Sequence, residues 1–154
     1  MGTRYFRAGV GTVIYNDKNE IAIFKRAQQP VGIWELQQGG IDLHELPEET
    51  LWRELYEEVG LIRDDVEAVD SMPGWTLYER AEPRDRESNI LGQAHCWFFL
   101  KLKSTTKIDL SKSLEDAASE FKWANFEHLI EITGTHKKHV YHELKNYFEA
   151  YVVK

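Results

Sequence analysis

The sequence lacks a second cysteine, a long apolar run and internal repeats. With Cys96 alone, no disulfide can form within the chain, which indicates a reducing compartment such as the cytoplasm. No apolar run approaches the ~18 residues needed to cross a bilayer. The first fifteen residues show no basic segment followed by an apolar stretch, which argues against a signal peptide. We therefore expect no membrane partner.

Positive charge is also in the minority. The 19 Lys and Arg residues face 26 Asp and Glu residues, for a formal net charge of −7. This balance argues against a broad cationic surface for duplex DNA, although it leaves room for a local basic pocket. The 154 residues are 42% apolar and 29% charged, as in globular rather than disordered proteins. The length predicts a single domain over residues 1–154, and the sequence leaves homodimerisation open.

Runs rich in β-branched and aromatic residues alternate with a few helical segments. Periodicity predicts strands over 8–15, 21–26, 34–36, 66–77, 93–102 and 120–123. It predicts helices over 47–59, 126–132 and 136–152, with Gly60 ending the first of them. A long charged loop over 79–92 is a candidate lid, and the polar segment 103–119 is expected to be irregular. Together these elements predict a mixed α/β sandwich.

The helix predicted over 47–59 separates apolar from acidic residues. At about 100° per residue, Glu54, Glu57 and Glu58 share the face of Arg53, and their i, i+3, i+4 spacing brings the carboxylates together. The acids repel one another and lie near the helix C-terminus, where anions are disfavoured. A solvated face is the ordinary alternative, but Mg²⁺ and Mn²⁺ prefer such clustered carboxylates. The opposite, apolar arc holds Leu51, Trp52, Leu55, Tyr56 and Val59.

The segment 39–61 resembles the Nudix box. Gly39 is followed after five residues by Glu45, and after seven more by Arg53-Glu54-Leu55-Tyr56-Glu57-Glu58-Val59-Gly60-Leu61. The resemblance implies an α/β/α sandwich with a mixed β-sheet and the box as a loop–helix–loop. It also implies hydrolysis of a nucleoside diphosphate linked to another group, with Mg²⁺ or Mn²⁺ as cofactor.

The same resemblance assigns roles within the box. Glu54, Glu57 and Glu58 would bind the metal ions, two or three in number, together with the Gly39 carbonyl. Arg53 would orient a carboxylate, while Glu45, Gly39 and Gly60 would be structural. Metal ions of this kind neutralise phosphate charge and lower the pKa of a bound water. The general base stays open between Glu57 and Glu120.

Segments outside the box resemble bacterial RNA pyrophosphohydrolases and dinucleoside polyphosphate hydrolases. They are residues 7–11, 34–41, 92–98, 120–123 and 136–141, with Gln37 where proline is usual. The resemblance adds Glu120 to the metal ligands and implies that Arg7, Arg26, Tyr78, His136 and Lys137 bind substrate. His136 stands where a stacking phenylalanine is usual. Ordinary surface or half-buried positions are the alternative for each of them.

These observations leave three functions to separate. The first is removal of pyrophosphate from 5′-triphosphorylated RNA. The second is hydrolysis of free dinucleoside polyphosphates, such as diadenosine tetraphosphate, or of nucleoside triphosphates. A binding module without activity is disfavoured, because it has no need for mutually repelling carboxylates.

Overall fold

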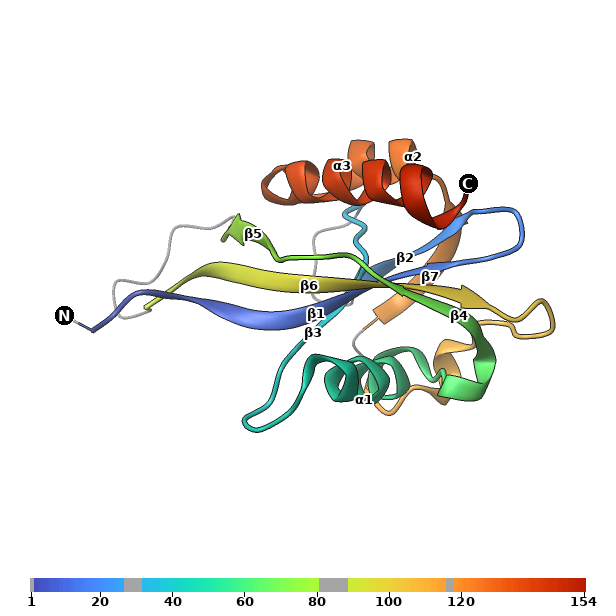
Figure 1. Cartoon of the computed structure of the whole chain (residues 1–154), viewed down its shortest axis with the longest axis horizontal. Coiled ribbons are helices and arrows are strands. Elements are labelled where there is room, and N and C mark those ends of the chain that lie inside the picture. The colour runs from blue at the N-terminus through green and yellow to red at the C-terminus, as the bar shows by residue number, and fades with distance from the viewer. Residues whose placement is uncertain (1, 27–31, 81–88, 116–117) are drawn as a thin grey trace.

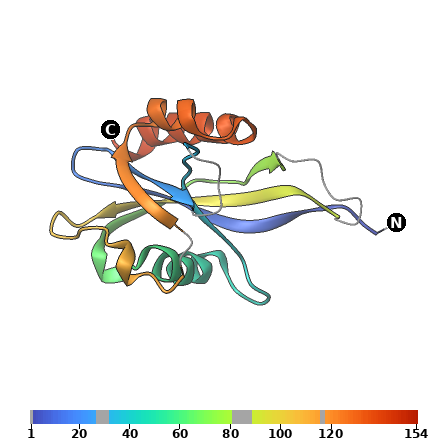
Figure 2. The same cartoon turned by 180° about the vertical axis from the view of Figure 1, so that it is seen from behind.

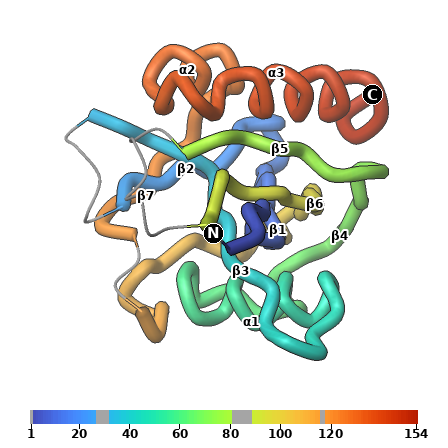
Figure 3. The backbone as a smooth tube through the Cα atoms, turned by 90° about the vertical axis from the view of Figure 1, so that its left-hand side faces the viewer, coloured from blue at the N-terminus to red at the C-terminus, as the bar shows by residue number. Residues whose placement is uncertain are grey.

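The computed structural model describes residues 2–26, 32–80, 89–115 and 118–154. Within these ranges, a mixed sheet lies between α1 on one face and α2 with α3 on the other (Figure 1). The view along the sheet in Figure 3 shows the same three layers. The predicted α/β/α sandwich is therefore confirmed. No helix in the described part is long and apolar enough to span a bilayer.

Seven strands of the described chain make up the sheet. They are β1 (Tyr5–Tyr15), β2 (Ile21–Arg26), β3 (Gln37–Gly40), β4 (Val66–Ser71), β5 (Thr76–Glu79), β6 (Ile90–Leu102) and β7 (Ala118–Ala124). The order is β4-β6-β1-β2-β7, with β3 paired to β1 and β5 paired to β6. Strands β1 and β6 run parallel, and the other pairs are antiparallel. Figure 2 brings the edge strand β7 to the front.

The helices are short and each covers one face of the sheet. They are α1 (Pro47–Val59), α2 (Phe126–Ile132) and α3 (Lys138–Tyr147), with 3₁₀ turns at Arg63–Asp65, Leu110–Lys112 and Thr135–Lys137 and a π turn at Phe148–Val152. The predicted bounds of α1 and α2 are confirmed. Gly60 ends α1 in the left-handed conformation, at φ 77°, which glycine adopts without steric cost.

Two predicted strands and one predicted helix differ in detail. The helix predicted over 136–152 is divided into a 3₁₀ turn at Thr135–Lys137, α3 and a π-helical turn at Phe148–Val152. The strand predicted over 34–36 is a single bridge between Glu35 and Phe24, and pairing resumes in β3. The segment 66–77, predicted to contain a strand, holds β4 and the start of β5. They are separated at Pro73-Gly74, a local turn signal, where Gly74 has φ 83°. Most of the predicted 79–92 loop, and with it the candidate lid, lies outside the described residues.

The core has one apolar cluster on each side of the sheet. Trp97 and Phe99 of β6 pack beneath α3, whereas Leu51 and Leu55 of α1 pack on the opposite face. Tyr56 was expected in the buried arc of α1, but its side chain is 45% exposed. It stands at the margin of that arc, where the helix surface already turns toward solvent.

Candidate active site

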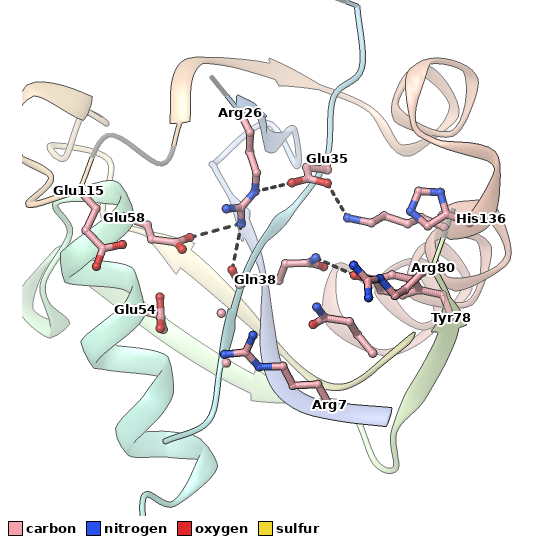
Figure 4. Close-up of a pocket in the computed structure, with 14 residues that line it drawn as sticks. Arg7, Arg26, Glu35, Gln38, Glu54, Glu58, Tyr78, Arg80, Glu115 and His136 are labelled. Atoms are coloured by element: carbon pink, nitrogen blue, oxygen red, sulfur yellow. Dashed lines mark hydrogen bonds and ion pairs between the residues drawn. The ribbon is translucent and has the colours of Figure 1, made fainter. Parts of the chain in front are cut away.

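An open cavity of about 510 Å³ is lined by residues of α1, of several strands including β3, and of the turn before α3 (Figure 4). Its lining mixes charges of both signs. The acidic residues are Glu35, Glu54, Glu58 and Glu115, and the basic residues are Arg7, Arg26, Arg80 and Lys137. Tyr78 and His136 supply aromatic surface. The cavity thus combines carboxylates, cations and rings within one space.

Arg53 holds the acidic residues of the box in place. Its guanidinium donates to Glu45 at 2.7 and 2.8 Å, to Glu54 at 2.8 Å and to Glu57 at 3.2 Å. It also donates to the Gly40 carbonyl at 3.0 Å, which ties α1 to the end of β3. The hydrogen bonds from Arg53 lower the pKa of Glu45 to about 2. Arg53 thus links Glu45, Glu54 and Glu57 to the end of β3, while the structural role of Glu45 and the orienting role of Arg53 stay predictions.

Glu54 and Glu58 carry charge under unfavourable conditions. Burial raises the pKa of both side chains, and that of Glu58 reaches about 7. The nearby Glu54 adds to the rise at Glu58, because two neighbouring carboxylates do not both ionise without cost. Gln37 donates to Glu58 at 3.1 Å. A bound cation would relieve this cost.

The donor set fits a divalent metal ion. A Cβ at position 39 would collide with the Glu54 carboxyl group. Glycine at this position therefore allows the Glu54 carboxylate to lie against the backbone of β3. In the described part of the chain, no three acidic, histidine or cysteine side chains surround one point. Glu54 and Glu58 line the cavity, whereas Glu57 is not among the lining residues. Because hard cations accept carboxylate oxygens, Glu54 and Glu58 are the best-placed metal ligands.

The predicted substrate residues all line the cavity: Arg7, Arg26, Tyr78, His136 and Lys137. Arg26 and Lys137 both hydrogen-bond Glu35. Among the residues that the structure describes, no side chain forms a hydrogen bond or ion pair with Arg7. Its guanidinium lies near Gly40. Tyr78 accepts a hydrogen bond from Gln38 at 2.9 Å.

Tyr78 and His136 form an edge-to-face ring pair with centroids 5.4 Å apart. Burial lowers the pKa of His136, which favours the neutral imidazole. Burial also raises the pKa of Tyr78 to about 12, so its hydroxyl stays protonated. The pair is an uncharged aromatic wall beside charged residues.

Glu120, the second candidate base, lies on β7. It is exposed on β7, opposite Lys25 in the strand register, and is not among the residues lining the cavity. Glu115 takes a place in the lining that the sequence did not reveal. The amides of Leu114 and Glu115 donate to the Glu57 carbonyl at 2.9 and 3.0 Å, and this contact between distant segments leaves no local sequence signal.

Comparison with known proteins identifies the family of the chain. The family model described as the NUDIX domain matches residues 5–144. The chain belongs to the Nudix family. Nudix hydrolases need divalent metal ions, which agrees with the carboxylate pair on α1.

Individual relatives support the same assignment. An RNA pyrophosphohydrolase of Pseudoalteromonas translucida is 34% identical over 96% of this chain and 87% of its own length. The dihydroneopterin triphosphate pyrophosphohydrolase of E. coli has a TM-score of 0.70 at 16% identity, covering 99% of both chains. An Ap4A hydrolase of C. elegans has a TM-score of 0.65 at 16% identity, covering 93% of this chain and 99% of that one. These two structures show the shared Nudix fold.

Proposed function

We propose that this protein hydrolyses the 5′-triphosphate of RNA to a 5′-monophosphate and pyrophosphate. One observation carries the proposal: a single open cavity places the α1 carboxylates opposite basic side chains and an aromatic pair. A 5′-triphosphate end has the matching order of groups, with polyphosphate at one end and a nucleoside at the other. The RNA pyrophosphohydrolase relative, at 34% identity, supports this substrate.

Glu54, Glu57 and Glu58, with the Gly39 carbonyl, would hold two or three Mg²⁺ or Mn²⁺ ions, and Glu120 or Glu115 would complete the set. When bound, these ions neutralise phosphate charge and acidify a water molecule. The site would lie on the face of α1 that Arg53 organises. All of these ligands bind through oxygen, which hard divalent cations prefer.

The protein's own residues would bind and orient the reactants. Arg7, Arg26 and Lys137 would contact phosphate oxygens. Tyr78 and His136 would contact the first nucleoside. Glu57, Glu115 or Glu120 would accept the proton of the attacking water as its oxygen bonds to phosphorus and the phosphoanhydride bond breaks, releasing pyrophosphate. Glu35 is unsuited to that task, because two cations already occupy its oxygens.

A free dinucleoside polyphosphate is the second candidate substrate. The cavity is lined by the basic side chains of Arg7, Arg26, Arg80 and Lys137, which would serve a compact polyphosphate equally well. The acidic net charge of −7 also gives no general attraction to a long RNA chain. The two substrates share the chemistry and differ in the group attached beyond the first nucleoside.

A competition assay separates them. Equal concentrations of 5′-triphosphorylated RNA and diadenosine tetraphosphate are offered with Mg²⁺, and kcat/KM is measured for each. We expect RNA to be preferred at least ~10-fold, equivalent to about 1.4 kcal/mol. RNA of the same sequence with a 5′-hydroxyl is the control and should release no phosphate. A preference for the dinucleotide would overturn the RNA assignment in favour of the second candidate.

A further inference from the structure

Glu35 is a buried carboxylate that the metal chemistry does not use. Its residue is 2% exposed, and its backbone is fixed by paired hydrogen bonds to Phe24 at 2.7 and 2.8 Å. One carboxylate oxygen accepts from Arg26 Nε and the other from Lys137 Nζ. Glu35 therefore joins the end of β2 to the turn that begins α3, and Figure 4 shows this link across the cavity.

The cations keep Glu35 charged. Burial alone would raise its pKa, but Lys137 and Arg26 outweigh burial and lower it. A buried charge with two hydrogen-bonded partners is restricted in geometry, since movement of any partner leaves another unpaired. The three side chains consequently behave as one rigid unit.

The unit fixes two cations at defined places. The Arg26 guanidinium also donates to the Gln38 carbonyl at 3.1 Å and lies 3.6 Å from a Glu58 oxygen, so it borders the carboxylate face of α1. The Lys137 ammonium lies 5.2 Å from the centre of the Tyr78 ring, so it borders the aromatic wall. The carboxylate of Glu35 sets the separation between these two points.

We propose that Glu35 is a positioning residue that holds Arg26 and Lys137 at the spacing a bound polyphosphate requires between α1 and the aromatic wall. The inference rests on the proposed function, because it concerns the same substrate site. Glu35 acts through the two cations and does not contact substrate. A preformed arrangement of charges reduces the cost of ordering side chains on binding, so its effect falls mainly on substrate affinity.

Substitution by glutamine isolates the charge. Glu35→Gln keeps the size of the side chain, but its amide group faces one of the cations as a donor against a donor. We expect KM for 5′-triphosphorylated RNA to rise at least ~10-fold while kcat changes less than ~3-fold. Glu67→Gln is the matched control, because it removes a surface carboxylate 3.0 Å from Lys101 and should leave KM unchanged. A fall in kcat with unchanged KM would overturn the positioning role.

A double-mutant cycle tests whether Glu35 acts through Lys137. If it does, Glu35→Gln should raise KM less in the Lys137→Gln background than in the wild type, with the remainder attributable to Arg26. Fully additive effects would overturn the coupling. If Glu35→Gln alone fails to fold, two other variants carry the test. The double variant removes one charge of each sign. Glu35→Asp keeps the charge on a shorter side chain, and its KM increase should be smaller than the increase of at least ~10-fold expected for Glu35→Gln.

A binding measurement separates this inference from the proposed function. The affinity of each variant for a non-hydrolysable imido analogue of tripolyphosphate is measured by calorimetry. We expect Glu35→Gln to weaken it at least ~10-fold, whichever nucleic acid is the substrate. If the wild-type protein does not hydrolyse 5′-triphosphorylated RNA, only the proposed function is rejected. Wild-type affinity for the analogue in Glu35→Gln would reject the role of Glu35 alone.

Discussion

Glu35 and Glu58 are both buried glutamates in the lining of one cavity, yet their surroundings act in opposite directions. Lys137 and Arg26 lower the pKa of Glu35 against the effect of burial. At Glu58, burial dominates and the nearby Glu54 adds to it, so the pKa rises to about 7. Arg26 touches both residues, but only Glu35 has it in direct hydrogen-bonding contact.

The difference separates two uses of a carboxylate. Glu35 has more cations than it needs and serves to fix geometry. Glu58 has too few, and its unfavourable charge is available for a cation from solution. The cations around Glu35 thus fix the geometry of one part of the cavity, whereas the carboxylate of Glu58 is available to bind a cation in another part. Substitutions at the two residues test that contrast, beginning with the largest effect.

Loss of a metal-ligand carboxylate should nearly abolish activity. We expect Glu58→Gln to lower kcat at least ~100-fold, a typical scale for disruption of a metal site, with far-ultraviolet circular dichroism unchanged. Glu48→Gln is the matched control, because Glu48 lies exposed in the first turn of the same helix. Hydrolysis of 5′-triphosphorylated RNA in the presence of Mg²⁺ measures the effect. Wild-type kcat in Glu58→Gln would remove it from the metal site.

The same substitution should change stability in opposite directions at the two residues. In metal-free protein at pH 8, Glu35→Gln should lower the free energy of unfolding by about 3 kcal/mol, since it leaves buried cations uncompensated. Glu58→Gln should leave it unchanged or raise it by up to about 1 kcal/mol, since it removes repulsion with Glu54. Urea denaturation provides the values. Equal destabilisation by both variants would show that the two environments do not differ.

The pH dependence of stability gives a smaller but signed effect. The pKa of Glu58 is about 7 in the folded protein against an ordinary 4.5, so the folded state binds more protons between these values. Its contribution is therefore present below about pH 4.5 and lost as pH rises to about 7. His95, whose pKa burial lowers to about 4, acts in the opposite sense. The difference between wild type and Glu58→Gln isolates the Glu58 contribution, and a difference that does not vary with pH would contradict it.

Local patterns explain which half of the site was predictable. The acids of α1 recur at helical spacing within five residues, so their shared face follows from the sequence. Glu35 and Lys137 are 102 residues apart, and only the packing of α3 against the sheet brings them together. Position 35 was predicted as part of a strand and Lys137 as a substrate residue, but their pairing has no local signature.

The fold shows the same division. The bounds of α1 and α2 follow from apolar periodicity and from end signals such as Gly60. The approach of Glu115 to α1 depends on tertiary contacts, in particular the hydrogen bonds to the Glu57 carbonyl. Likewise, the helical pattern predicted that Tyr56 is buried, but its side chain is exposed.

Direct titration with Mn²⁺, followed by electron paramagnetic resonance of the free ion, tests the central contrast. It compares wild type with Glu58→Gln and Glu35→Gln at pH 8. We predict that Glu58→Gln weakens Mn²⁺ binding at least ~10-fold, whereas Glu35→Gln retains it within about threefold. Wild-type Mn²⁺ affinity in Glu58→Gln, or an equal loss in Glu35→Gln, would contradict the division of the cavity into a metal face and a positioning unit.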